Sequence, residues 1–163
     1  MITAVASLAA LASGTTLAAQ VRPCELVTSA EIVEITGVAP ARVRTEGPTE
    51  DKETGATTWD CGWQAGEQFV FIWVIRLRSE AAALRVLTEA SQTSRIIPEG
   101  VALSKVAGPG DHSLWGASAE GAVWVAQRGT AVLAFVYAGE SKSGPVVREP
   151  MRKALAAAIG RLP

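Results

Sequence analysis

The sequence predicts an α+β fold, an antiparallel β-sheet with helices packed on it. Three observations lead to this prediction. Strand-like segments are joined by short turns, a helical pattern follows each group of strands, and this order of strands and then a helix occurs twice. Residues 20–163 are expected to form one exported domain, and residues 1–19 a leader.

The leader is predicted from a stretch without charge, Ala4 to Ala19. Its apolar run, Val5 to Leu11, is shorter than the roughly 20 apolar residues of a membrane-spanning helix. Small side chains then give signal peptidase a site after Ala18 or Ala19. No Lys or Arg precedes the apolar run, so a misassigned start and an apolar first helix of a cytosolic protein are the alternatives. We expect export to the periplasm or secretion.

The stretch TTWDCGWQ places Cys61 between Trp59 and Trp63, and Cys24 is the other cysteine of the chain. In an oxidising compartment, two cysteines of a small domain usually pair. They form no CxxC motif, and a structural zinc site needs four ligands. The flanking tryptophans indicate burial, whereas a reactive thiol needs an exposed setting. We therefore expect a structural disulfide between Cys24 and Cys61.

The first helix is expected after Thr28 and Glu31, which have the spacing of a capping box, and should end at Gly37. Residues 41–46 can form a strand, which the Gly-, Pro- and acid-rich residues 47–56 should end. Residues 57–64 alternate along the next strand. One face should carry Trp59, Cys61 and Trp63, and the other Thr58, Asp60 and Gln64.

A turn at residues 65–67 leads into residues 68–77, QFVFIWVIRL. This run is apolar on both faces until Arg76, so we expect a central strand covered on both sides. Ser79 should cap a second helix. Its apolar residues at helical spacing are Ala83, Leu84, Leu87 and Ala90.

The second half repeats this order. It begins with a weak strand at residues 101–106 and a glycine-rich loop at residues 108–116, GPGDHSLWG. Residues 123–127 and 131–137 should form a hairpin, and Pro145 should open a last helix that ends at Gly160. The inward residues of that helix are expected to be Val146, Val147, Met151, Leu155 and Ile159.

The charge balance excludes some classes of partner. Fifteen Lys and Arg residues face 16 Asp and Glu residues, and no basic stripe occurs. This argues against nucleic acid as a partner and against an electrostatic membrane anchor. We expect no stable membrane insertion after cleavage of the leader and no cofactor. The partner would be a protein or a small molecule of unknown identity.

Three stretches resemble the landmarks of a known family: Pro23 to Gly37, Asp60 to Trp63, and Lys105 to Trp115. They are similar to the Pro-Cys-x-Leu opening, the second cysteine beside aromatics and the Val-x-Gly-x-Gly-Asp loop of the DUF3558-type family of small secreted bacterial proteins. Many members are lipoproteins or extracytoplasmic sensor domains, and some resemble the PsbP-like α/β/α sandwich. The resemblance implies such a sandwich and supplies no catalytic residue. The chain lacks the lipidation cysteine of the lipoprotein members.

The glycine-rich loop holds the candidate ligand-binding residues, Asp111, His112 and Trp115. A small periplasmic hydrolase centred on His112, with Glu120 or Asp111, is the alternative. Consecutive side chains diverge, however, and no G-x-S-x-G elbow presents a serine. We therefore predict no catalytic residue, and a tight loop in which Asp111 bonds backbone amides. A non-enzymatic binding or interaction domain is the preferred function.

Two further features have structural explanations. The acidic residues 45–55 lack the alternating ligand pattern of a compact calcium site, so we expect a solvated loop and no metal. Of the five tryptophans, Trp59, Trp63 and Trp73 are expected in the core, while Trp115 is expected as an exposed contact in a loop.

Overall fold

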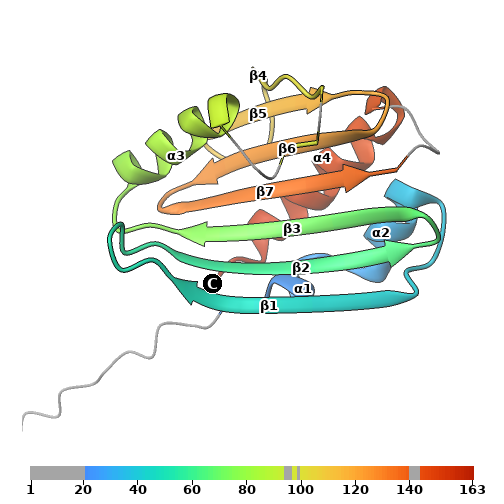
Figure 1. Ribbon diagram of the computed structural model, residues 1–163, viewed down its shortest axis with the longest axis horizontal. Helices are drawn as coiled ribbons and strands as arrows, with labels where there is room; N and C mark the ends of the chain where they lie inside the picture. Colours follow the sequence, from blue (N-terminus) through green and yellow to red (C-terminus); the bar gives the residue numbers. More distant parts are fainter. Residues whose placement is uncertain (1–20, 94–96, 99, 140–143) are drawn as a thin grey trace, which may run out of the picture.

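The computed structural model describes residues 21–93, 97–98, 100–139 and 144–163, and the expected leader at residues 1–19 lies outside them. Seven strands form one antiparallel sheet in the order β1-β2-β3-β7-β6-β5-β4 (Figure 1). The strands are β1 (Arg42–Glu50), β2 (Thr57–Ala65), β3 (Gln68–Arg76), β4 (Ser104–Lys105), β5 (His112–Ala117), β6 (Gly121–Arg128) and β7 (Ala131–Ala138). The helices are α1 (Pro23–Leu26), α2 (Ser29–Thr36), α3 (Glu80–Thr93) and α4 (Gly144–Gly160). The predicted α+β class with an antiparallel sheet is confirmed.

Three helices cover one face of the sheet. In Figure 1, α1, α2 and α4 lie behind the strands, and their apolar residues join the inward residues of β2, β3, β6 and β7 in one core. Ile32, Phe135, Met151 and Leu155 are fully buried there. We call this the closed face.

Among the described residues, one helix covers the opposite face, which we call the open face. Ala83 and Leu87 of α3 pack on apolar residues of β5, β6 and β7. The near side of β1, β2 and β3 carries no helix in Figure 1. The outward residues of β3 are therefore only partly buried, and the Phe69 side chain is 39% exposed. The prediction that β3 is covered on both sides is wrong for this half of the sheet.

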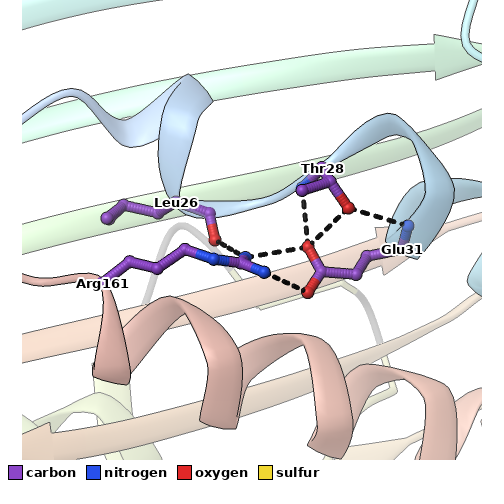
Figure 2. A network of polar contacts seen from close by, with 4 residues as sticks. All are labelled: Leu26, Thr28, Glu31 and Arg161. Carbon is purple, nitrogen blue, oxygen red and sulfur yellow. Dashed lines mark hydrogen bonds and ion pairs between the residues drawn. The ribbon is translucent and has the colours of Figure 1, made fainter.

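A disulfide and a polar network attach the first two helices to the closed face. Cys24 of α1 bonds Cys61 of β2, with the Cα atoms 5.3 Å apart, so the predicted disulfide is confirmed. Glu31 completes the capping box by accepting from the Thr28 N–H at 2.6 Å. Its carboxylate also pairs with both terminal nitrogens of Arg161, which follows α4 (Figure 2). Arg161 donates further to the Leu26 carbonyl.

That network changes the acidity of Glu31. Partial burial alone would raise the pKa of Glu31, but the hydrogen bonds from Arg161 and Thr28 outweigh it and leave the pKa below its ordinary value. Glu31 thus links the start of α2 to the end of α4 while it is ionised.

Several predicted boundaries need correction. β1 continues to Glu50, past the expected end at Glu46, because its pairing with β2 resumes at Thr49 and Glu50 after a bulge. The expected strand at residues 101–106 is reduced to Ser104–Lys105. The expected loop at residues 108–116 contains β5, which pairs with β6 from His112 onward.

Val146, which was expected to point inward, and Leu84, one of the apolar residues at helical spacing, are exposed. Val146 is 60% exposed near the start of α4, and Leu84 is 41% exposed on α3. Helical spacing correctly predicts that Ala83, Leu87 and Val147 are buried against the sheet. Leu84 and Val146, each next to one of these residues, lie outside the buried face of their helix.

Candidate functional site

A cleft of about 620 Å³ lies on the open face between α3 and the segment that runs from β4 into β5. Ligand pockets typically measure about 300–1,000 Å³, so the size suits a small molecule. Its lining comes from α3 (Leu84, Leu87, Thr88), from residues around β4 (Leu103, Lys105, Val106, Ala107), from the glycine-rich loop (Gly108, Gly110, Asp111) and from β5 (His112, Ser113, Leu114).

One wall of the cleft consists of three residues that share one side of α3. Leu84, Leu87 and Thr88 are three and four positions apart, which places them together on a helix surface. The helix begins after Ser79, whose Oγ accepts from the Ala82 N–H at 3.2 Å. Leu87 is 4% exposed and holds the helix on the sheet, whereas Leu84 remains open to the cleft.

The opposite wall depends on a tight turn before β5. Gly110 has φ of +86°, and a Cβ there would lie 2.5 Å from the carbonyl oxygen of Gln127. Glycine is therefore required where the loop approaches the backbone of β6. The Asp111 N–H donates to the same Gln127 carbonyl at 2.7 Å, and the Ser113 hydroxyl donates to the Pro109 carbonyl.

Asp111 holds the loop against the β6–β7 turn. Its Oδ2 accepts from the Gly129 N–H at 2.9 Å, and its Oδ1 accepts from Arg128 at 2.9 Å. The Gly129 hydrogen bond, with help from Arg128, keeps the pKa of Asp111 below its ordinary value. As predicted, Asp111 bonds a backbone amide in a tight loop.

His112 lines the cleft, but its neighbours do not form a catalytic relay with it. His112 is exposed at the start of β5, and Ser113, the next residue, is buried. Consecutive strand residues point to opposite faces, and the Ser113 hydroxyl and both Asp111 oxygens have other partners. Glu120 follows the far end of β5 and does not line the cleft.

Trp115 is not among the residues that line the cleft with Asp111 and His112. Its expected exposure is also wrong. Its side chain is 9% exposed and joins the core of the closed face. The ring centroid is 4.9 Å from that of Trp124, and the Arg148 guanidinium lies 5.8 Å from the Trp115 centroid. The reason is that Trp115 belongs to a strand rather than a loop, and it alternates with Leu114 on the cleft side.

Sequence reasoning missed the residues that make the cleft apolar and basic. The sequence places Leu84 among the apolar residues at helical spacing, and it places Lys105 in a weak strand at the start of a family landmark, but it indicates no ligand-binding role for either residue. The lining residues come from two separate segments of the chain, residues 84–88 and residues 103–114. A local signal existed only for the glycine-rich loop.

The other candidate tryptophans and the acidic loop have structural roles. Trp63 is 3% exposed and Trp59 packs against the same core, as predicted, while Trp73 is partly buried on the open face.

In the acidic loop, Asp51 Oδ1 accepts from the Glu53 N–H at 2.9 Å and from the Thr54 N–H at 3.3 Å. These residues form a hydrogen-bonded turn at the end of β1.

Comparison with models of known protein families finds no match, and neither does comparison with curated protein sequences. Among the described residues, no three Asp, Glu, His or Cys side chains gather as a metal site requires. In the same part of the chain, no helix is long and apolar enough to span a membrane.

Proposed function

We propose that this chain is an exported, non-enzymatic binding domain whose ligand occupies the cleft between α3 and β5. One observation carries the proposal: the cleft combines an apolar floor with polar groups at its rim. Leu87 and Leu114 form the floor, and Lys105, Asp111 and His112 stand at the rim. Small-molecule sites commonly have this composition, in which apolar area gives affinity and a few polar groups orient the ligand.

Export is supported by the Cys24–Cys61 disulfide, which persists in oxidising compartments such as the periplasm or the extracellular medium. The leader expected at residues 1–19 supports it from the sequence. The resemblance to the DUF3558-type family, whose members are secreted, fits the proposed export. The PsbP-like sandwich and the two strands-then-helix units remain our proposal for the fold. N-terminal sequencing of the protein recovered from the periplasm would test the proposed export. We expect the chain to begin at Ala19 or Gln20, and a protein that keeps Met1 would contradict export.

The non-enzymatic part of the proposal concerns His112. Ser113 and Asp111, the sequence neighbours of His112, bond other groups and do not form with it the relay that a hydrolase would need. His112→Ala should change ligand binding by no more than a few-fold. General acid–base groups contribute about 10²–10⁴-fold to catalysis. A loss of that size in esterase or peptidase turnover, with the circular dichroism spectrum unchanged, would favour the hydrolase.

The cleft is tested by filling it. Thr88 is an exposed residue on the cleft wall, and Arg85 is an exposed residue of the same helix outside the lining. We would purify the wild type, Thr88→Trp and Arg85→Trp from the periplasm and extract bound small molecules for mass spectrometry. The wild type and Arg85→Trp should carry the same ligand, and Thr88→Trp should lose it. Equal ligand in all three proteins would contradict the cleft as the binding site.

A further inference from the structure

We propose that the ligand of the cleft is a single alkyl chain that bears an anionic head group, such as a carboxylate or a phosphate ester. The inference rests on the proposed function, because it takes the same cleft as the binding site. It follows from three properties of the lining: the kind of apolar side chain, the charge at the rim and the size of the space.

The apolar lining is entirely aliphatic. Leu84, Leu87, Leu103, Val106 and Leu114 supply it together with Ala107, and no Phe, Tyr or Trp is found among the described residues that line the cleft. The chain places its aromatic rings elsewhere, with Trp115 and Trp124 on the closed face. Planar ligands are usually bound by stacking on aromatic rings, whereas leucine side chains suit a flexible methylene chain.

The space of about 620 Å³ is large enough for a single alkyl chain with its head group. Leu87 and Leu114 are 4% and 5% exposed at the bottom, and Leu84 at the mouth is 41% exposed. An alkyl chain lying between them would cover the Leu84 side chain, which is one of the few large apolar side chains exposed among the described residues. Burial of this surface favours binding in proportion to the apolar area removed from water.

The charge at the rim selects an anion. Asp111 is the acidic residue of the lining, and Arg128 and the Gly129 N–H already bind its two oxygens. Lys105 is exposed, and within the described part of the chain it forms no ion pair. His112 lines the same rim, and its ring adds at most the few-fold contribution to binding that His112→Ala measures. The uncompensated charge at the mouth is therefore the positive charge of Lys105.

The experiment measures displacement of a fluorescent fatty acid from the mature protein, below the critical micelle concentration of each competitor. The first series is octanoate, decanoate and dodecanoate. Each added methylene should tighten binding by up to about fourfold, which corresponds to about 0.8 kcal/mol per buried methylene. Affinity that does not depend on chain length would overturn the alkyl part of the proposal.

The second series varies the head group at constant chain length. Dodecanoate and dodecanoyl lysophosphatidylglycerol should compete at least about tenfold better than dodecanol, since hydrogen bonds to charged groups contribute about 1.5–3 kcal/mol. Whichever anion binds more tightly identifies the source of the chain, a free fatty acid or a lysophospholipid. If dodecanol binds as tightly as both anions, the proposed cleft stands and the anionic head group is wrong.

Two pairs of variants test whether Lys105 binds the head group and whether the ligand lies in the cleft beside Thr88. Lys105→Met keeps an unbranched apolar stem and should weaken dodecanoate about tenfold while leaving dodecanol unchanged. Lys153→Met, at an exposed position on α4, should change neither. Thr88→Trp should abolish displacement by both ligands and Arg85→Trp should not. Full dodecanoate binding by Thr88→Trp would overturn the site, and an unchanged Lys105→Met would overturn the role of the charge.

Discussion

The two faces of the sheet differ in how completely they are covered. On the closed face, α1, α2 and α4 bury a continuous core that includes Trp63 at 3% exposure. On the open face, α3 covers only β5 to β7 and leaves a cleft at its edge. A disulfide and the Glu31–Arg161 pair reinforce the closed face. The open face therefore has its own, smaller buried core, and only this face carries the cleft proposed as the binding site.

The alternation of β3 shows this difference within one strand. Val70, Ile72 and Val74 point to the closed face and are fully buried. Phe69 and Phe71, on the other side, form a stacked pair with ring centroids 6.2 Å apart. Gly62 lies opposite Phe71 on β2, and a Cβ at Gly62 would come within 2.7 Å of the ring. The Phe71 ring therefore covers the backbone of β2 where a helix does not.

The largest expected effect compares Trp63 with Phe69. Trp63→Ala should lower the free energy of unfolding by about 3–5 kcal/mol, because it opens a cavity in a packed core. Phe69→Ala should cost less, because Phe69 is 39% exposed and loses mainly its stacked contact with Phe71, which contributes about 0.5–1.5 kcal/mol beyond area burial. Urea denaturation of both variants measures the two costs. Equal costs would mean that the open face is as tightly packed as the closed one.

The next effect is that of the disulfide. Replacing Cys24 and Cys61 together by alanine should cost about 2–5 kcal/mol, because the bond closes a loop with a sequence separation of 37. The unreduced wild type should show no reactive thiol when it is titrated in denaturant. A reducing agent should destabilise the wild type and leave the double variant unchanged. Two titratable thiols in the unreduced protein would contradict the bond.

Local features of the fold could be predicted, and the arrangement of its layers could not. The Thr28–Glu31 capping box and the β6–β7 hairpin depend on residues a few positions apart, so their patterns are visible in the sequence. The pairing of β3 with β7 joins two distant segments. The position of α3 over one half of the sheet depends on that pairing, and the exposure of Leu84 and Phe69 follows from it.

The candidate site was predicted in the same partial way. The glycine-rich loop marked Asp111 and His112, since glycine and proline in a short stretch indicate a tight turn. The same stretch led to the wrong prediction of an exposed Trp115, because a strand begins inside it at His112. Lys105 and Leu84 are brought to the site only by tertiary packing, and no spacing in the sequence connects them.

A smaller effect concerns the reinforcement of the closed face by Glu31. Its folded pKa lies below the ordinary value of 4.5, so its stabilisation is complete above that pH and is lost as the pH falls through the folded value. Glu31→Gln should cost about 1 kcal/mol at neutral pH, a figure reduced by solvent screening, and should flatten the acid dependence. Glu149→Gln breaks an exposed pair with Arg152 and serves as the control, with little change expected. A steeper acid dependence in Glu31→Gln would contradict the role of the network.

The smallest effect tests the two faces on β2 itself. Thr58 pairs with Ile75 of β3 and is partly exposed on the open face. Its side chain alternates with Trp59, which packs against the core of the closed face. Thr58→Ala should therefore change the free energy of unfolding by no more than about 0.5 kcal/mol, as surface substitutions do. Chemical denaturation beside Trp63→Ala gives the comparison within a single strand. If Thr58→Ala were the more damaging of the two, the closed and open faces of β2 would have to be exchanged.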